Sequence, residues 1–361
     1  MKKVGFFSLA FSLAGCFLGT GFISGQEQWQ YFGVFGVSGF VGLMLAMLLI
    51  FIFCAVMLSY ARKTEECEFD RLVIAQERPY LRTAVGAVTV FFMFTTYVVM
   101  TAGAGDLLNQ TFGLPSYVGR ALICMLIMTV SFLGISGMFS VLSVFIPILI
   151  VFTFVIFFAS PHPLSLEAIN AKCEDVNNPL LSSWWISALN SATYNVGSSL
   201  GVIVTIGAYA KSRKSVLLGT GVCMLALTVF SCCLLIVMHA HPEITQAQLP
   251  MVAYAGSLSS WVGKLFAVFL FVGMFSSSLA ISVSVCNYMQ SKLKKMPRAL
   301  GVYGLPFVMA LIAFLCGKVG FSSLVSVVYP ISGYVSILFI VLIIINYVRH
   351  KISHEKGESR Q

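Results

Sequence analysis

The fold is decided by the stretch Leu13-Ala14-Gly15-Cys16-Phe17-Leu18-Gly19-Thr20-Gly21-Phe22, which lies inside the first long apolar segment of the chain. Its closely spaced glycines weaken a helix, each by about 1 kcal/mol relative to alanine. An interruption at Gly19-Thr20-Gly21 would free carbonyl groups that can bind a cation and N–H groups that can bind an anion. The alternative is that these glycines only allow close packing of one helix against another.

The composition places this stretch in a membrane. The chain has 361 residues, of which 58% are hydrophobic and 10% are charged, and its mean hydropathy is +0.94. Apolar runs of about 20 residues recur along nearly the whole length, which is typical of transmembrane helices. We therefore predict one all-helical bundle of about ten spans, near residues 4–31, 36–60, 83–111, 115–135, 139–160, 184–210, 214–238, 261–290, 299–317 and 320–348.

The basic residues between the spans predict the orientation. The net charge is +9, with 22 lysines and arginines. If the N-terminus is cytoplasmic, all of them lie on the inner side except Arg120, Lys172, Lys264 and Lys318. Because cytoplasmic loops carry the excess of positive charge, we expect a multi-pass protein of the bacterial cytoplasmic membrane with both termini inside. Topology thus accounts for the charge, and no nucleic-acid partner is expected.

Three other sequence patterns bear on processing and metal binding. The start of the chain, ending at Leu13-Ala14-Gly15-Cys16, is similar to a bacterial lipoprotein signal. The residues after Cys16 stay apolar, however, so a membrane span is favoured over lipidation. Most cysteines lie in apolar runs without ligand spacing, which argues against a disulfide framework or a zinc site. His239 and His241 are expected to be surface residues at the end of a helix.

A second weak helix centre lies in the span 184–210, where the sequence from Asn190 to Gly201 is rich in glycine and serine. Asn190 and Asn195 are costly in lipid unless they face a partner or a cavity. Each half of the chain therefore opens with a span that is weak in its middle. This pairing indicates an inverted-repeat transporter whose site lies at the two interruptions.

A candidate cation site lies in the span 261–290. Gly273, Ser276 and Ser277 share one helix face, and a carbonyl and two hydroxyls are oxygen ligands suited to Na⁺. The alternative is that the serines bond to their own helix and pack tightly.

The segment Ala14–Gly21 resembles the broken first helix of LeuT-fold transporters of the amino acid–polyamine–cation superfamily. The segment Gly201–Ala210, followed by Lys211, is similar to the second half of their sixth helix, and Gly273–Ser277 is similar to the part of their eighth helix that lines a sodium site. The segment Gly19-Thr20-Gly21-Phe22-Ile23-Ser24-Gly25-Gln26-Glu27 most closely resembles the YkvI family of bacterial membrane proteins. The resemblance implies a 5+5 inverted repeat with broken helices 1 and 6. Residues 1–348 would form one transporter domain, with repeats near 4–160 and 184–348 and a cytoplasmic tail at 349–361.

The resemblance also implies positions for the ligands. It implies a Na⁺ site made by the carbonyls of Gly15, Leu18 and Gly273 and the hydroxyls of Ser276 and Ser277. It implies a substrate site at Gly19, Thr20, Gly21, Tyr194, Asn195 and Gly197, with Tyr97 as a further pocket residue. The sequence departs from the family pattern at Phe22, where sodium-coupled amino acid transporters often carry a polar ligand, so a second Na⁺ site is not implied.

Glu27 is the notable charged residue of the first span. It lies about 9 Å past Gly21 along a helix, in the outer half of the span. A charge at the membrane centre costs about 2.5–3.5 kcal/mol. We therefore expect a carboxyl that is protonated, hydrogen-bonded to a neighbour such as Gln26 or Gln30, or exposed to a water-filled vestibule. Proton coupling and a purely structural role both stay open.

These patterns predict a secondary active transporter that moves a small polar solute by alternating access, coupled to Na⁺ or H⁺. The solute would be an amino acid or a related amine or metabolite, and no organic cofactor is expected. The alternative is a non-transporting receptor or sensor on the same fold. No converging nucleophile or metal-binding constellation is found in the sequence, so an enzyme is not predicted.

Overall fold

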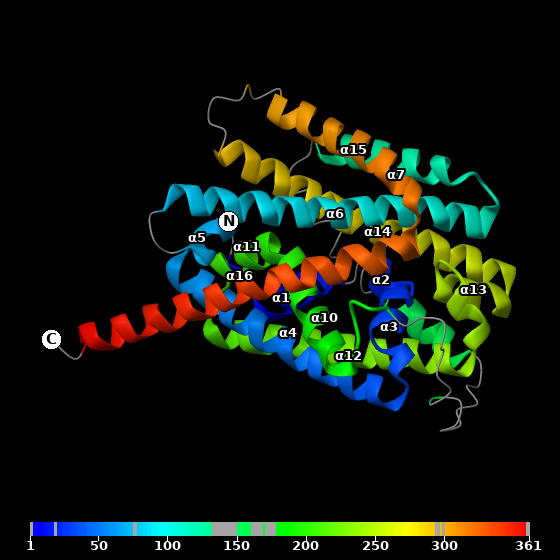
Figure 1. Cartoon of the computed structure of the whole chain (residues 1–361), viewed down its shortest axis with the longest axis horizontal. Coiled ribbons are helices and arrows are strands. Elements are labelled where there is room, and N and C mark those ends of the chain that lie inside the picture. Colours follow the sequence, from blue (N-terminus) through cyan, green and yellow to red (C-terminus); the bar gives the residue numbers. More distant parts are fainter. Residues whose placement is uncertain are drawn as a thin grey trace.

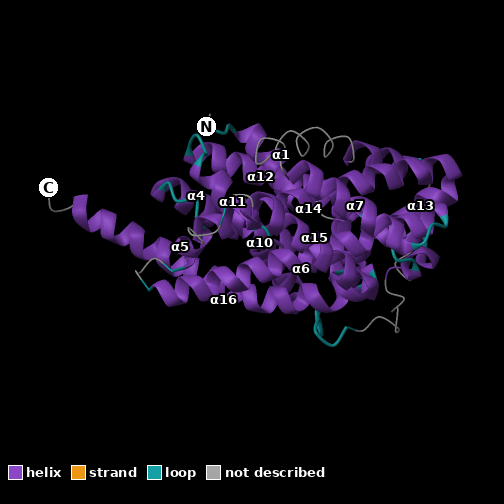
Figure 2. Cartoon of the chain, turned by 90° about the horizontal axis from the view of Figure 1, so that it is seen from above, coloured by secondary structure: helices purple, strands orange, loops and turns teal. Residues whose placement is uncertain are grey.

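The regular secondary structure of this protein is helical throughout the part of the chain that the structure, a computed structural model, describes. The described residues are 3–17, 20–74, 78–131, 150–159, 169, 178–292, 297 and 300–358. The long helices lie side by side along one axis of the molecule (Figures 1 and 2). The prediction of an all-helical membrane bundle is confirmed.

The first half of the chain contains a broken series of short helices followed by long ones. The elements are α1 (Phe6–Phe17), α2 (Thr20–Ile23), α3 (Gln26–Tyr31), the 3₁₀ turn η1 (Gly33–Phe35), α4 (Val37–Thr64), α5 (Phe69–Val73), α6 (Pro79–Phe112) and α7 (Ser116–Ser131). Residues 150–158 are also helical.

The second half of the chain also combines short and long helices. The elements are α10 (Trp184–Ser198), α11 (Leu200–Ala208), α12 (Arg213–Ala240), η3 (Pro242–Gln246), α13 (Pro250–Leu258), α14 (Ser260–Lys292), η4 (Leu300–Gly304), α15 (Leu305–Cys316), η5 (Gly317–Val319) and α16 (Phe321–Glu358).

The long helices match the predicted spans. Within the described residues, five helices are long and apolar enough to cross a membrane, namely α4, α6, α12, α14 and α16, and the apolar helices α1, α7 and α15 are shorter. The predicted span at 139–160 falls outside the described residues except for 150–159. The total of ten spans therefore stays a prediction.

The described residues of the first predicted span belong to three helices, α1, α2 and α3. α1 ends at Phe17 and α2 begins at Thr20, while Leu18 and Gly19 lie outside the described residues. A second division, not predicted from the sequence, lies at Gly25, whose φ of +83° is in the left-handed region that glycine adopts without strain. A side chain there would also meet the sulfur of Met238 at 3.0 Å.

The span 184–210 is divided at Ser199, which separates α10 from α11. The Ser199 N–H still donates to the Asn195 carbonyl at 3.3 Å. The division falls next to the Gly197-Ser198 pair that the sequence marks as weak.

α16 is longer than predicted, because it continues to Glu358 and includes most of the expected tail. Its last turns project beyond the body of the molecule (Figure 1). Pro330 lies inside this helix and cannot donate to the carbonyl of Ser326, four residues earlier. Asn178 Nδ2 donates to that carbonyl instead, at 2.7 Å.

The N-terminus, the C-terminus and α5 lie toward the same end of the bundle (Figure 1). There the Val4 N–H donates to the Tyr209 carbonyl at 2.8 Å, which joins the chain start to the end of α11. α5, which was not predicted, is tied to α16 because Asn346 Nδ2 donates to the carbonyls of Leu72 and Val73.

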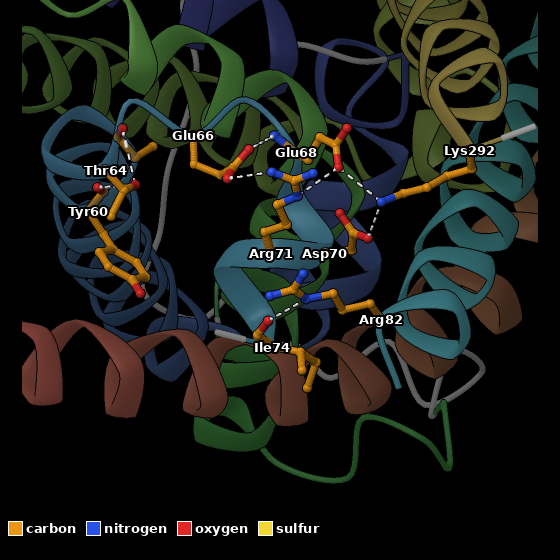
Figure 3. Close-up of polar contacts among 10 residues, drawn as sticks. Tyr60, Thr64, Glu66, Glu68, Asp70, Arg71, Ile74, Arg82 and Lys292 are labelled. Atoms are coloured by element: carbon orange, nitrogen blue, oxygen red, sulfur yellow. Dashed lines mark hydrogen bonds and ion pairs between the residues drawn. The ribbon is translucent and has the colours of Figure 1, made fainter. Parts of the chain in front are cut away.

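A cluster of charged side chains joins α5 to the end of α14 (Figure 3). Lys292 Nζ lies 2.7 Å from Asp70 Oδ2 and 2.9 Å from Glu68 Oε2, and the Asp70 side chain is fully buried. Partial burial alone would raise the pKa of Glu68. The hydrogen bond and charge of Lys292, with the charges of Arg71 and Arg82, hold that pKa below its usual range.

Candidate functional site

A small buried cavity lies where the two divided spans meet. Its volume is about 40 Å³, which exceeds the roughly 10–15 Å³ that one water molecule needs. The lining is mixed, with hydroxyls, an amide and one carboxylate among apolar groups. It consists of Gly15, Cys16, Phe17, Glu27, Thr96, Met100, Tyr194, Asn195, Ser198, Ser199, Val202, Ser277, Ala280, Ile281 and Tyr329.

Glu27 and Asn195 form the polar centre of this cavity. The Glu27 side chain is only 3% exposed. Its Oε1 accepts a hydrogen bond from Asn195 Nδ2 at 3.0 Å, and the same amide nitrogen also donates to the Ser191 carbonyl. This contact joins α3, in the predicted first span, to α10, in the predicted span 184–210.

The expected partners of Glu27 are corrected by the structure. Gln26 Nε2 and Gln30 Nε2 both donate to Ser322 of α16, at 2.7 and 3.2 Å, instead of bonding to Glu27. The reason is geometric, because these two glutamines share a helix face on which Glu27 does not lie.

A second set of hydrogen bonds fixes α3 against α10. Tyr31 Oη donates to Asn190 Oδ1 at 3.1 Å, and Ser187 Oγ donates to the Tyr31 carbonyl at 2.6 Å. Asn190 Nδ2 in turn donates to the carbonyl of Pro330 in α16. Asn190 and Asn195 thus have the polar partners that buried asparagines require.

Two tyrosines form an aromatic wall of the cavity. The rings of Tyr194 and Tyr329 are stacked, with centroids 4.0 Å apart and planes inclined by 21°. Both side chains are buried. Their polar tips and flat faces offer hydrogen bonding and a quadrupole to whatever enters the space.

The residues expected to hold Na⁺ are partly brought together. Gly15 and Ser277 line the same cavity. Ser276 lies outside the lining, and its hydroxyl donates to the Val272 carbonyl of its own helix at 2.8 Å. Gly273 is buried in α14 and also lies outside the lining, while Leu18 lies outside the described residues.

Two of the residues expected to hold substrate line the cavity. These are Tyr194 and Asn195, whereas Thr20 and Gly21 belong to α2. Gly19 lies outside the described residues.

Gly197 and Tyr97 lie away from the cavity lining. Gly197 faces α16, where a Cβ on it would lie 2.0 Å from Ser336 Oγ. Tyr97 is fully buried, with its ring centroid 6.1 Å from that of Phe94.

Several lining residues were missed by sequence reasoning. Thr96, next to the predicted pocket residue Tyr97, lines the cavity. Ala280 follows Ser277 by three positions on the same helix face, and that spacing could have indicated it. Nothing in the sequence around Tyr329, apart from the adjacent proline, marks it as a pocket residue.

His239 is not a surface residue as expected. Its side chain is buried, with its ring centroid 5.2 Å from that of Trp29 and 5.8 Å from that of Phe40. The last turn of α12 is covered by α3, which the sequence pattern does not reveal.

The sequence of the chain is similar to two proteins of Bacillus subtilis (strain 168). The uncharacterized membrane protein YkvI is 24% identical over 335 residues, which cover 92% of this chain and 93% of YkvI. The uncharacterized protein YyaD is 24% identical over 347 residues, which cover 92% of this chain and 94% of YyaD. No family model matches the chain. The predicted resemblance to YkvI is confirmed.

The fold is shared with solved transporters. The structure of MhsT in complex with L-phenylalanine has a TM-score of 0.68 and 15% identity, covering 94% of this chain and 90% of MhsT. A substrate-bound, outward-open Na⁺-coupled sialic acid symporter has a TM-score of 0.63 and 13% identity, covering 88% and 72%. The manganese transporter of Eremococcus coleocola has a TM-score of 0.58 and 15% identity, covering 94% and 78%. These neighbours give the chain the LeuT fold.

Proposed function

We propose that this protein is a secondary active transporter that moves a small polar solute, an amino acid or a related amine, by alternating access coupled to Na⁺ or H⁺. One observation carries the proposal: the buried polar cavity takes its walls from both divided spans at once. Gly15 comes from α1 and Glu27 from α3, while Asn195 and Val202 come from α10 and α11. Interrupted helices are the structural means by which such folds present backbone groups to a solute.

The size of the cavity supports alternating access. At about 40 Å³ it holds water but no amino acid, and most of its lining residues are buried. A solute can therefore enter only after the helices around the cavity move apart. Movement of one group of helices against another is the expected way to expose the site to each side in turn.

The proposed Na⁺ site uses Gly15, Leu18, Gly273, Ser276 and Ser277. The hydrogen bond from Ser276 to Val272 leaves the lone pairs of the hydroxyl oxygen free to coordinate a cation. Coupling to H⁺ through Glu27 is the alternative, and it is supported by the burial of that carboxyl.

The proposed topology has ten spans in two inverted repeats, near 4–160 and 184–348, with both termini in the cytoplasm. The shared end at which the termini lie is consistent with an even number of spans (Figure 1). The excess of lysine and arginine on that side supports the orientation.

The test is solute uptake by the full chain in proteoliposomes. We expect accumulation of an amino acid or amine when an inward Na⁺ or H⁺ gradient is imposed. Accumulation that is unchanged after both gradients are collapsed would contradict the coupling. Replacing Ser276 and Ser277 with alanine distinguishes the ions, because loss of Na⁺ dependence is expected only if these hydroxyls bind Na⁺.

A further inference from the structure

The charge of the cavity is set by one residue. Glu27 is the only charged side chain among the described residues that line the cavity. It is almost fully buried, and Asn195 supplies one neutral hydrogen bond to it. An ionised carboxylate in such surroundings is strongly destabilised unless a cation lies beside it. Glu27 is therefore either neutral by protonation or ionised beside a bound cation, and a second negative charge next to it is unfavourable.

The other walls favour an organic cation over a bare metal ion. The stacked rings of Tyr194 and Tyr329 line the same cavity as Glu27. Aromatic faces attract ammonium groups and their attached methylene groups. The hydroxyls of Ser198 and Ser199 can accept hydrogen bonds from N–H donors. Carboxylate, ring faces and hydroxyls together match the alkylammonium group.

The same charge argues against a zwitterion. In an α-amino acid the carboxylate is attached to the carbon that bears the ammonium group, so it would lie close to Glu27. No basic side chain lines the described part of the cavity to offset that repulsion. Removing the carboxylate of the solute should therefore strengthen its binding.

We propose that the solute is a primary amine carried as its ammonium ion, with the ammonium group bound by Glu27 against the Tyr194–Tyr329 pair. The inference rests on the proposed transport function, since it assigns the solute class of that same cavity. It is tested by binding, which does not require transport to occur.

The experiment compares three probes that share one side chain and differ in charge: 2-phenylethylammonium, L-phenylalanine and 3-phenylpropionate. A second set uses ethylammonium, L-alanine and propionate to allow for a smaller site. Thermal unfolding of the purified full chain is followed in detergent without Na⁺, because binding to the native state raises the melting temperature. We expect the ammonium member of at least one set to bind at least tenfold more tightly than its zwitterion and its acid.

Three variants locate the effect. Glu27→Gln keeps the size of the side chain and an acceptor for Asn195, and it should weaken ammonium binding at least tenfold. Glu27→Asp keeps the charge and should retain the preference for ammonium. Asp106→Asn is the matched control, because Asp106 lies outside the cavity and accepts from the Phe321 N–H at 2.8 Å. It should leave ammonium binding unchanged.

Three results would each overturn the inference. The zwitterion could bind as tightly as the ammonium ion or more tightly, Glu27→Gln could bind the ammonium ion as tightly as the wild type does, or the wild-type chain could fail to bind the ammonium ion. Stabilisation by Na⁺ alone that Glu27→Gln removes would assign the carboxylate to a metal ion and would also overturn it. Failure of the proposed function has a different signature, which is ammonium binding with no gradient-driven flux of any solute. Flux of a solute with no ammonium binding would leave transport standing and remove only the solute class.

Discussion

Replacing Gly197 with alanine should destabilise the protein by bringing α10 into collision with α16. The added Cβ would lie 2.0 Å from Ser336 Oγ and 2.5 Å from Ser336 Cβ, and Ser336 is itself 2% exposed. Overpacking of this kind costs about 1–3 kcal/mol. The cost should disappear in large part when Ser336 is replaced by glycine as well, because the next nearest atom is Ser336 Cα at 3.8 Å.

The assay is a double-mutant cycle on the thermal stability of the purified chain. Gly197→Ala and Ser336→Gly are measured alone and together, and the pair should be more stable than the sum of the single losses predicts. The second variant alone also loses stability, since glycine in a helix costs about 1 kcal/mol relative to alanine. Strict additivity of the two losses would refute the packing role of Gly197. Loss of solute binding without loss of stability would instead place Gly197 in the site.

Three further outcomes are expected. Lys292→Met leaves the fully buried Asp70 without its cation. Losing one partner of a buried ion pair costs about 3–5 kcal/mol, and because Lys292 is 34% exposed, the loss of stability should fall below that range. Adding Asp70→Asn should restore part of the lost stability in the same melting assay. The pKa of Glu68 is lowered in the folded chain, so its contribution to stability is present above the ordinary glutamate pKa of about 4.3 and is lost as pH falls through the lower folded value. In Glu68→Gln the melting temperature should therefore fall less steeply as the pH is lowered. A fall as steep as in the wild-type chain would contradict the ion pair. Ser277→Ala should reduce the Na⁺ dependence of uptake, and full Na⁺ dependence in that variant would remove Ser277 from the proposed ion site.

The membrane helices could be predicted because lipid imposes a simple rule on the sequence. A run of about 20 apolar residues must form a helix to satisfy its own backbone, so the ends of α4, α12 and α14 fall close to the predicted bounds. The short helices α5 and α13 could not be found in this way. They lie between spans, where polar and apolar residues mix and tertiary contacts decide the local structure.

The candidate site could be predicted only in part, because its decisive contact joins distant residues. Glu27 and Asn195 are 168 positions apart in the sequence. Each was singled out as a polar residue that needs a partner in lipid, yet nothing in the sequence pairs them. Sequence spacing suggested Gln26 and Gln30 instead, and these bond to Ser322.

The glycines illustrate the same limit. A glycine in a transmembrane helix signals a close approach, but the sequence does not say whether a solute or another helix approaches. Gly15 lines the cavity, whereas Gly197 packs on Ser336. The two glycine-containing helix centres therefore differ in role, because one glycine borders the cavity and the other packs against a neighbouring helix.

The most direct test of the central claim is to fill the cavity and measure gradient-driven uptake. Ala280 lines the cavity and is 5% exposed, so Ala280→Trp should occupy the space and Ala280→Leu should narrow it. We predict that uptake of the transported solute into proteoliposomes falls in the order wild type, leucine, tryptophan, while both variants elute as folded protein in size-exclusion chromatography. Uptake by a folded tryptophan variant at the wild-type rate would contradict the claim that solute passes through this cavity.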